Sequence, residues 1–268
     1  MNLVYPFLLY NTGMAQAPAL NHIGTLNERS LHAALKAHLA QPGDQLEVSV
    51  DGYVIDIVRG ETLIEVQTGG FFPLRRKLST LSQTHPVHLY APIAQRKYIL
   101  RLDNEGNQLS RRKSPRKGTA FDLFNELLSL RTCLPHPNLW LHVLLCEIEE
   151  VWVDDGKGSW RKRYWSLTDQ RLLNVQTEII LHNSEDYLGL LPPGLPQPFT
   201  NTELAKHAKC RARLAGKATY ALSAMGLLAR VKGSGRAHHF VFTPEAERHP
   251  ANCDIVEEAG KKETDHVH

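Results

Sequence analysis

Residues 50–77 read VDGYVIDIVRGETLIEVQTGGFFPLRRK, and the rest of the chain is organised around this stretch. Two runs within it, 53–59 and 62–67, are rich in apolar and β-branched residues, as strands are. Only Gly60-Glu61 separates them, and a glycine-first pair suits a two-residue hairpin turn. The stretch therefore predicts an antiparallel β-hairpin whose register is set by its turn.

Two acidic residues lie within this otherwise apolar hairpin. When Arg59 pairs with Thr62, the ladder places Asp56 directly opposite Glu65. Like charges directly opposite each other destabilise a sheet, and the apolar neighbours of both acids indicate partial burial. The pair therefore predicts a compensating partner, a role that a divalent cation fills. A solubilising edge position or a half-buried salt bridge is the alternative for each acid.

The spacing of these residues resembles the restriction-endonuclease-like PD-(D/E)xK phosphodiesterases. In that family an aspartate, a glutamate and a backbone carbonyl hold Mg²⁺ or Mn²⁺, and the matching groups here are Asp56, Glu65 and the Val66 carbonyl. The third side chain of the motif is usually lysine, but this sequence has Gln67 there. The resemblance implies that the catalytic cation comes from elsewhere, and Lys77 on the following helix is the candidate.

The elements predicted around the hairpin follow the order of that family's core, α, β, β, β, α, β. Apolar spacing predicts a helix over 25–40, strands over 46–50 and 87–93, and a helix that opens at Pro73. Members of the family often carry a glutamate near the metal on the first helix, so Glu28 is an additional ligand candidate. The alternative role of Glu28 is to stabilise the first turn of the helix by interacting with the helix dipole.

Basic residues gather at two places after the hairpin. Arg75 and Arg76 stand beside Lys77 on the predicted helix. Residues 110–118, SRRKSPRKG, predict a loop because Pro and Gly break the run. Compact basic loops contact phosphates, although solvated surface clusters look the same in a sequence. The basic residues of this loop are Arg111, Arg112, Lys113, Arg116 and Lys117.

A second unit follows the proline-rich stretch 192–198. The pattern predicts a helix over 199–208, a longer helix over 211–228 and a hairpin around Gly233-Ser234-Gly235. This order resembles the winged helix-turn-helix domain, which implies that the longer helix enters the major groove of duplex DNA. A winged helix used for protein contact or dimerisation is the alternative. The implied DNA contacts are Arg211, Arg213, Lys217 and Tyr220, all pointing outward from the helix, with Lys232 and Arg236 on the wing.

The predicted fold class is α/β (α+β), with a restriction-endonuclease-like three-layer αβα core around a mixed sheet and a C-terminal winged-helix domain. The expected parts are a flexible N-terminus 1–24, a nuclease-like domain 25–153, a connector 154–198, a winged helix-turn-helix 199–243 and an acidic disordered tail 244–268.

Composition narrows the functional class. The net charge is +3, but the charge is unevenly distributed: residues 245–268 have seven acids and three Lys or Arg, whereas residues 1–244 carry +7. A basic body of this kind is typical of a protein that binds a polyanion. No apolar run is long enough to span a bilayer, so no membrane partner is expected. Four cysteines without zinc-ligand spacing fit a reducing cytoplasm.

These observations support two functional hypotheses and a third, weaker one. The first is a Mg²⁺- or Mn²⁺-dependent endonuclease that cuts DNA, with the winged helix for targeting. The second is a catalytically inactive nuclease-fold DNA-binding protein or transcriptional regulator, which Gln67 favours. The third is a protein-interaction scaffold. Double-stranded DNA is the expected partner, RNA stays open as a substrate, and a homodimer is kept as an assembly option.

Overall fold

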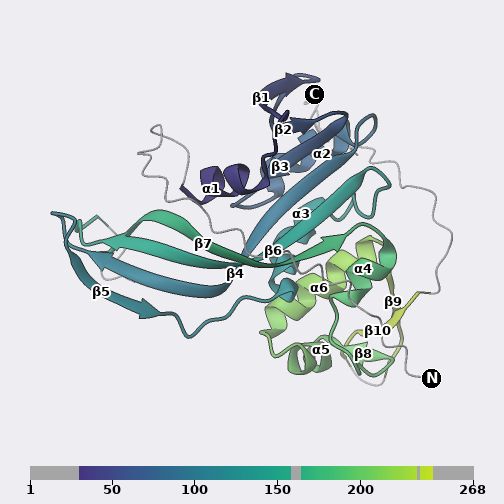
Figure 1. Ribbon diagram of the computed structural model, residues 1–268. Coiled ribbons are helices and arrows are strands. Elements are labelled where there is room, and N and C mark those ends of the chain that lie inside the picture. The colour runs from purple at the N-terminus through teal and green to yellow at the C-terminus, as the bar shows by residue number, and fades with distance from the viewer. Residues whose placement is uncertain (1–29, 158–163, 234–235, 244–268) are drawn as a thin grey trace, which may run out of the picture.

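A mixed sheet of seven strands organises the computed structural model, which describes residues 30–157, 164–233 and 236–243 (Figure 1). The strands run in the order β1-β2-β3-β4-β6-β7, with β5 also paired to β4. β4 is parallel to β3 and to β6, and the other pairs are antiparallel. The strands are β1 (Gln45–Val50), β2 (Tyr53–Arg59), β3 (Thr62–Val66), β4 (Val87–Leu102), β5 (Gln108–Lys113), β6 (Leu139–Val153) and β7 (Ser166–Leu181).

Helices cover both faces of this sheet. Successive residues of a strand point to opposite faces. Leu144 and Cys146 of β6 pack with α1, whereas Val143 and Leu145 belong to the buried cluster that contains α2 and α3. The predicted α/β class with a mixed sheet is therefore confirmed. The helices are α1 (Ser30–Leu39), η1 (Phe72–Leu74), α2 (Arg75–Leu81), η2 (Ala120–Leu123) and α3 (Phe124–Leu130).

The hairpin predicted around Gly60-Glu61 forms in the predicted register, with Arg59 opposite Thr62. The β2–β3 ladder ends two pairs later, at Ile57 and Ile64. The predicted pairing of Asp56 with Glu65 in this ladder is therefore wrong. The reason lies in the Val66 N–H, which donates to the Asp56 carboxylate at 2.8 Å instead of to a β2 carbonyl.

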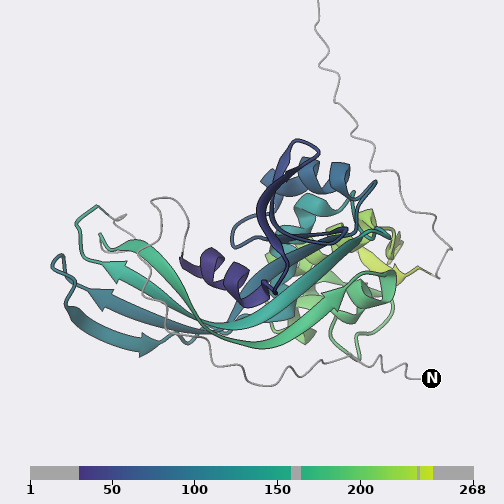
Figure 2. The same cartoon turned by 45° about the horizontal axis from the view of Figure 1, so that its top comes forward.

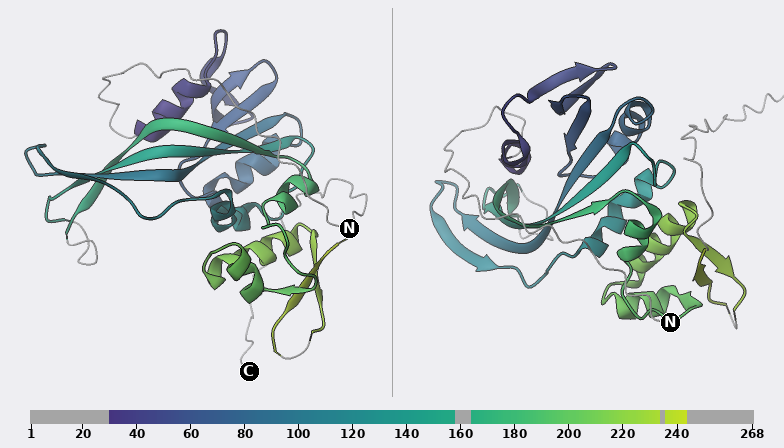
Figure 3. Two further views of the ribbon diagram at one scale, coloured as in Figure 1. Left: turned by 60° about the horizontal axis from the view of Figure 1, so that its bottom comes forward. Right: turned by 45° about the vertical axis from the view of Figure 1, so that its right-hand side comes forward.

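Four strands extend beyond the helices as a long arm (residues 96–113, 147–153 and 166–174), which projects from the body in every view (Figures 1 and 3). β4 continues past the predicted end at residue 93, and its pairing with β6 resumes after a register shift between Ala94 and Arg96. α1 lies against β7 where the arm begins (Figure 2).

Two sequence predictions for this arm are wrong. The basic segment from Arg111 to Lys113 is not a loop, because it forms the edge strand β5 against β4. Residues 166–181 are not a connector, because they form β7 against β6. The β6–β7 ladder has three register shifts, and each breaks the alternation from which a strand is predicted.

The two predicted helices of the C-terminal part and the paired strands of its hairpin are observed, while Ser234 and Gly235 at the predicted tip lie outside the described residues. Thr200 caps α5, since its hydroxyl accepts from the Glu203 N–H at 3.3 Å and the Glu203 carboxylate accepts from the Thr200 N–H at 2.7 Å. Within the described residues no helix has the length and apolarity that a bilayer span requires. The elements are α4 (Ser184–Gly189), β8 (Phe199–Thr200), α5 (Asn201–His207), α6 (Ala212–Ala224), β9 (Leu228–Val231) and β10 (His239–Phe242), with sheet order β8-β10-β9.

α6 packs against α3 (Figure 3), so the C-terminal part shares its core with the large sheet. Phe124 and Leu127 of α3 and Ala218 and Leu222 of α6 are all fully buried in one cluster. The predicted outward position of Lys217 is therefore wrong: the residue is half-buried, and its Nζ donates to Asn125 Oδ1 at 2.9 Å.

Candidate active site

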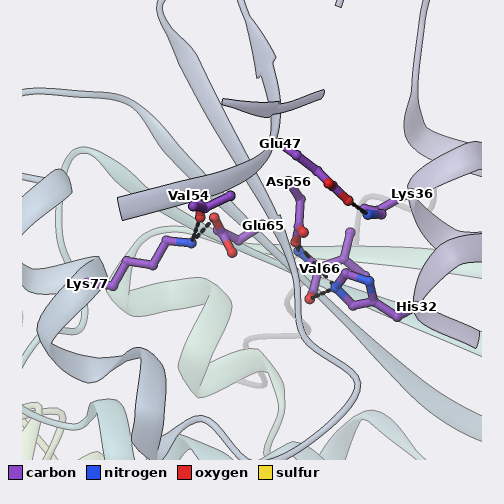
Figure 4. A network of polar contacts seen from close by, with 8 residues as sticks. All are labelled: His32, Lys36, Glu47, Val54, Asp56, Glu65, Val66 and Lys77. Atoms are coloured by element: carbon purple, nitrogen blue, oxygen red, sulfur yellow. Dashed lines mark hydrogen bonds and ion pairs between the residues drawn. The ribbon is translucent and has the colours of Figure 1, made fainter. Parts of the chain in front are cut away.

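Asp56 lies where β2 and β3 stop pairing (Figure 4). Its carboxylate accepts a hydrogen bond from the Val66 N–H, which would otherwise have no acceptor in the sheet. Asp56 therefore lies beside Val66, and its charge also acts on Glu65, the preceding residue of β3. The three residues that the sequence predicted as metal ligands are thus neighbours on two adjacent strands, with Glu65 directed at Lys77 and Asp56 at Val66 (Figure 4).

Lys77 approaches this place from α2, and Figure 4 shows its side chain directed at Glu65. Its Nζ forms an ion pair with the Glu65 carboxylate and donates to the Val54 carbonyl at 2.5 Å. Glu65 is only 4% exposed, and this burial raises the pKa of its carboxyl, although the Lys77 hydrogen bond and charge oppose the change. The cation expected from the sequence therefore stands beside the buried acid.

His32 of α1 approaches from the other side (Figure 4). Its Nε2 lies 2.8 Å from the Val66 carbonyl oxygen and 3.4 Å from Asp56 Oδ2. Sequence reasoning missed His32. One signal was available, since His32 follows the buried Leu31 on the helix and so lies near the face that packs on the sheet. Glu28, the other candidate from this helix, lies outside the described residues.

The two carboxyl groups differ in their electrostatics. Burial pushes the pKa of Asp56 upward, but hydrogen bonds from His32 and the Val66 N–H, with the charge of Lys36, bring it below the usual 3.8. Asp56 is therefore an anion at neutral pH.

The donor set at this place suits a small hard cation. Mg²⁺ favours carboxylate and carbonyl oxygens and is commonly held by one or two carboxylates, with water and substrate phosphate completing its shell. Asp56, Glu65 and the Val66 carbonyl provide such oxygens. No group of three or more His, Cys, Asp or Glu side chains placed for a metal occurs among residues 30–157, 164–233 and 236–243, so the fit depends on these two carboxylates and one carbonyl.

Gln67 follows the end of β3 and lines a neighbouring cleft of about 400 Å³. Its side-chain amide donates to the Gly70 carbonyl at 2.8 Å rather than to either acid. Lys97 and Arg116 also line the cleft, paired with Glu150 at 2.6 Å and Asp122 at 3.3 Å respectively. The cleft thus places two cations next to the loop that follows the acids.

The other predicted nucleic-acid contacts come from several elements rather than one. Arg111 pairs with Glu149 at 2.7 Å, and its guanidinium lies 4.4 Å from the centre of the Tyr98 ring. Arg116 and Lys217 are engaged by Asp122 and Asn125. The remaining ones are exposed: Arg75 and Arg76 on α2, Arg112 and Lys113 on β5, Lys117 after it, Arg211, Arg213 and Tyr220 at α6, and Lys232 and Arg236 between β9 and β10.

A second polar cluster, also missed from the sequence, joins three strands. His142 Nδ1 lies 2.6 Å from Glu178 Oε1, and His142 Nε2 lies 2.7 Å from His88 Nδ1. His88 also stacks on Trp140, with ring centres 4.8 Å apart. Burial, together with nearby His142 and His182, lowers the pKa of His88 to about 4.

The lowered pKa of His88 predicts that the folded protein loses stability in acid. The unfolded chain binds a proton at His88 near pH 6.5 and the folded chain only near pH 4, so the unfolded state is favoured as pH falls through that window. His88→Gln is expected to reduce the loss of unfolding free energy between pH 6.5 and 4, as measured by urea denaturation. His207→Gln, an exposed change on α5, should keep the parent's pH slope. Equal slopes for both variants would contradict this assignment.

Comparison with known proteins gives two matches. The sequence model of the family described as Domain of unknown function (DUF8091) matches residues 29–182, which run from α1 through β7 and include Asp56, Glu65 and Lys77. An uncharacterized protein of Treponema pallidum (strain Nichols) is 35% identical over 185 residues, which cover 69% of this chain and 74% of that protein. No solved structure matches the chain.

Proposed function

The chain belongs to the family described as Domain of unknown function (DUF8091), and we propose that it is a metal-dependent endonuclease that hydrolyses phosphodiester bonds in DNA. One observation carries the proposal: Lys77 meets the buried Glu65 beside Asp56 and Val66. Two carboxylates, a carbonyl and an ammonium group are the parts that phosphodiester hydrolysis needs, because they can hold a cation and balance charge on a phosphate.

Asp56, Glu65 and the Val66 carbonyl would hold Mg²⁺ or Mn²⁺. The bound cation would supply a Lewis acid for the phosphate and lower the pKa of the attacking water. His32 donates to the Val66 carbonyl, which has a second lone pair left for another partner. Lys77 can donate to a phosphate oxygen through a proton that Glu65 and Val54 leave unused. Gln67 can orient water but brings no charge.

The exposed cations on α2, β5 and α6 support DNA as the substrate class, since backbone phosphates are bound mainly by Lys and Arg. The described cysteines Cys133, Cys146 and Cys210 are thiols, which suits the cytoplasmic location that belongs to this proposal.

A catalytically inactive DNA-binding protein or transcriptional regulator is the second candidate function. Gln67 favours it, because an amide stands where the resemblance expects a lysine. In that case the Lys77–Glu65 pair would serve stability alone, and DNA binding would be independent of metal.

Plasmid cleavage distinguishes the two candidates. We expect supercoiled plasmid to be nicked with Mg²⁺ or Mn²⁺ and left intact with EDTA, and Asp56→Asn to remove the activity. Glu47→Gln is the matched control, because Glu47 is an exposed acid that pairs with Lys36 of α1 and is outside the proposed donor set. Cleavage by Asp56→Asn at the parent rate contradicts the proposal, and metal-independent binding without cleavage supports the regulator.

A further inference from the structure

A basic groove of about 500 Å³ lies between α3 and α6. We propose that it binds a nucleotide, with the phosphate on its cations and the base on Tyr220. The residues that line it are Leu128, Arg131, Arg213, Gly216, Lys217 and Tyr220.

The groove is shaped by helix geometry. Arg213, Gly216, Lys217 and Tyr220 are spaced i, i+3, i+4 and i+7, so they share one face of α6. Gly216 has no side chain to fill the space between its neighbours on this face. A Cβ built there would have one heavy atom within 4 Å, Asn201 Nδ2 at 3.7 Å, so the site leaves open room.

The positive charges of the groove are not neutralised by acidic residues in its described lining. Among the described residues that line it none is acidic. Arg131 donates to the Leu128 carbonyl at 2.7 Å, and Lys217 donates to the Asn125 amide oxygen at 2.9 Å, so both partners are neutral. On the arm, by contrast, Lys97 and Arg111 each pair with a glutamate.

An anion would relieve this imbalance, because like charges held near one another repel and a phosphate interacts with all of them. The guanidinium groups of Arg131 and Arg213 also match the planar, two-point hydrogen bonding that phosphates favour. Phosphate is therefore the anion that the side chains fit best.

Tyr220 is the reason to infer a nucleotide rather than a phosphate alone. Its side chain is 56% exposed although it lies in the groove. The Arg131 guanidinium lies 5.5 Å from the ring centre, over one face. An aromatic ring has two faces, and the other can receive a base by stacking.

The groove adjoins the candidate active site through α3. Asn125 lines the cleft that also contains Gln67, and the same side chain accepts from Lys217 in the groove. A strand that continues from Asp56 and Glu65 along this cleft would pass Asn125 and so approach the groove. As a contact for the strand being cut, the groove rests on the proposed function, but as a nucleotide site it does not.

Binding in EDTA tests the groove without cleavage. The full chain is titrated with inorganic phosphate, with AMP and with a fluorescent strand of ten thymidines, by calorimetry and anisotropy. Arg213→Gln and Lys217→Gln are each expected to weaken AMP or strand binding about tenfold, since each removes a charged hydrogen bond. Gly216→Leu should do the same without changing net charge. Arg171→Gln, an exposed loss of charge on β7, is the matched control and should change binding less than about twofold.

The outcomes separate the sources of the ligand. Binding of AMP supports a free nucleotide, and binding of the strand without AMP supports a nucleotide within a polymer. Equal affinities for Arg213→Gln, Lys217→Gln and Arg171→Gln overturn the proposal, as does binding of inorganic phosphate with no preference for AMP or the strand. If the parent does not cut but the groove variants lose binding, the nuclease proposal fails and the groove stands. If the groove variants bind and cut like the parent, only the groove fails.

Discussion

Replacing Lys77 by methionine is expected to lower metal-dependent cleavage about 10²–10³-fold, the loss typical when one preorganised donor to a transition-state charge is removed. The reason is local. Gln67 brings no charge to the site, whereas Lys77 already holds an ammonium group against the Glu65 carboxylate. The single-turnover rate on plasmid, with protein in excess, measures the effect without interference from product release.

Arg171→Met is the control for this change. Arg171 is exposed on β7 and pairs with Asp169, so the variant loses the same charge without touching Glu65 or a predicted DNA contact. Its rate should stay within about twofold of the parent's, as expected for exposed charges. If Lys77→Met cuts as fast as Arg171→Met, Lys77 has no part in the reaction.

The same substitution also tests the ion pair as a structural element. Removing Lys77 leaves Glu65 buried without its cation, which should cost about 3–5 kcal/mol of unfolding free energy at neutral pH. In the Glu65→Gln/Lys77→Met double variant no unpaired charge is buried, so part of the loss should be recovered. Cleavage, in contrast, should not be recovered in the double variant. This split separates a catalytic role from a merely structural one.

The hairpin and its acids could be predicted because their signals are local. The Gly60-Glu61 turn sets the register within a few residues, and the observed ladder follows it. Lys77 was also within reach of sequence reasoning. The apolar stripe that contains Leu78 and Leu81 fixes which face of α2 is buried, and both side chains are fully buried.

Contacts between distant segments could not be predicted in the same way. His32 and Val66 are 34 residues apart, and their contact depends on how α1 lies on the sheet. The link between His88 and His142 depends on the parallel pairing of β4 with β6, whose register no local pattern specifies. Both clusters therefore emerge only from the tertiary structure.

The arm was hard to predict because its strands lack a clean apolar face. All six residues of β5 are exposed, so it shows neither strand alternation nor burial, and its charges suggested a loop. Edge strands commonly carry Lys and Arg, which discourage pairing with other chains. Ion pairs such as that of Arg111 with Glu149 compensate for this composition, and they appear only when the strands are side by side.

Truncating Leu127 to alanine should destabilise the whole chain, by about 2–5 kcal/mol, because Leu127 is fully buried and its removal leaves a cavity. Leu127 lies in α3 within the buried cluster that also contains Val143 of the sheet and Leu222 of α6. A continuous core couples the parts that the sequence predicted as separate domains. We therefore expect the sheet and α6 to unfold in one urea transition, in both the parent and the variant.

Two probes can follow the two parts in one experiment. Tryptophan fluorescence reports on the sheet through tryptophans that include Trp140 and Trp152 of β6, and hydrogen exchange of the α6 amides reports on the C-terminal part. Leu109→Ala on β5 is the matched control, since the same side chain is there 57% exposed and should cost less than about 0.5 kcal/mol. If Leu127→Ala lowers stability at Trp140 but leaves the protection of α6 unchanged, the core shared by α3 and α6 does not couple them. The same midpoint shift at both probes would instead mean that one core couples the sheet and α6 in a single unfolding transition.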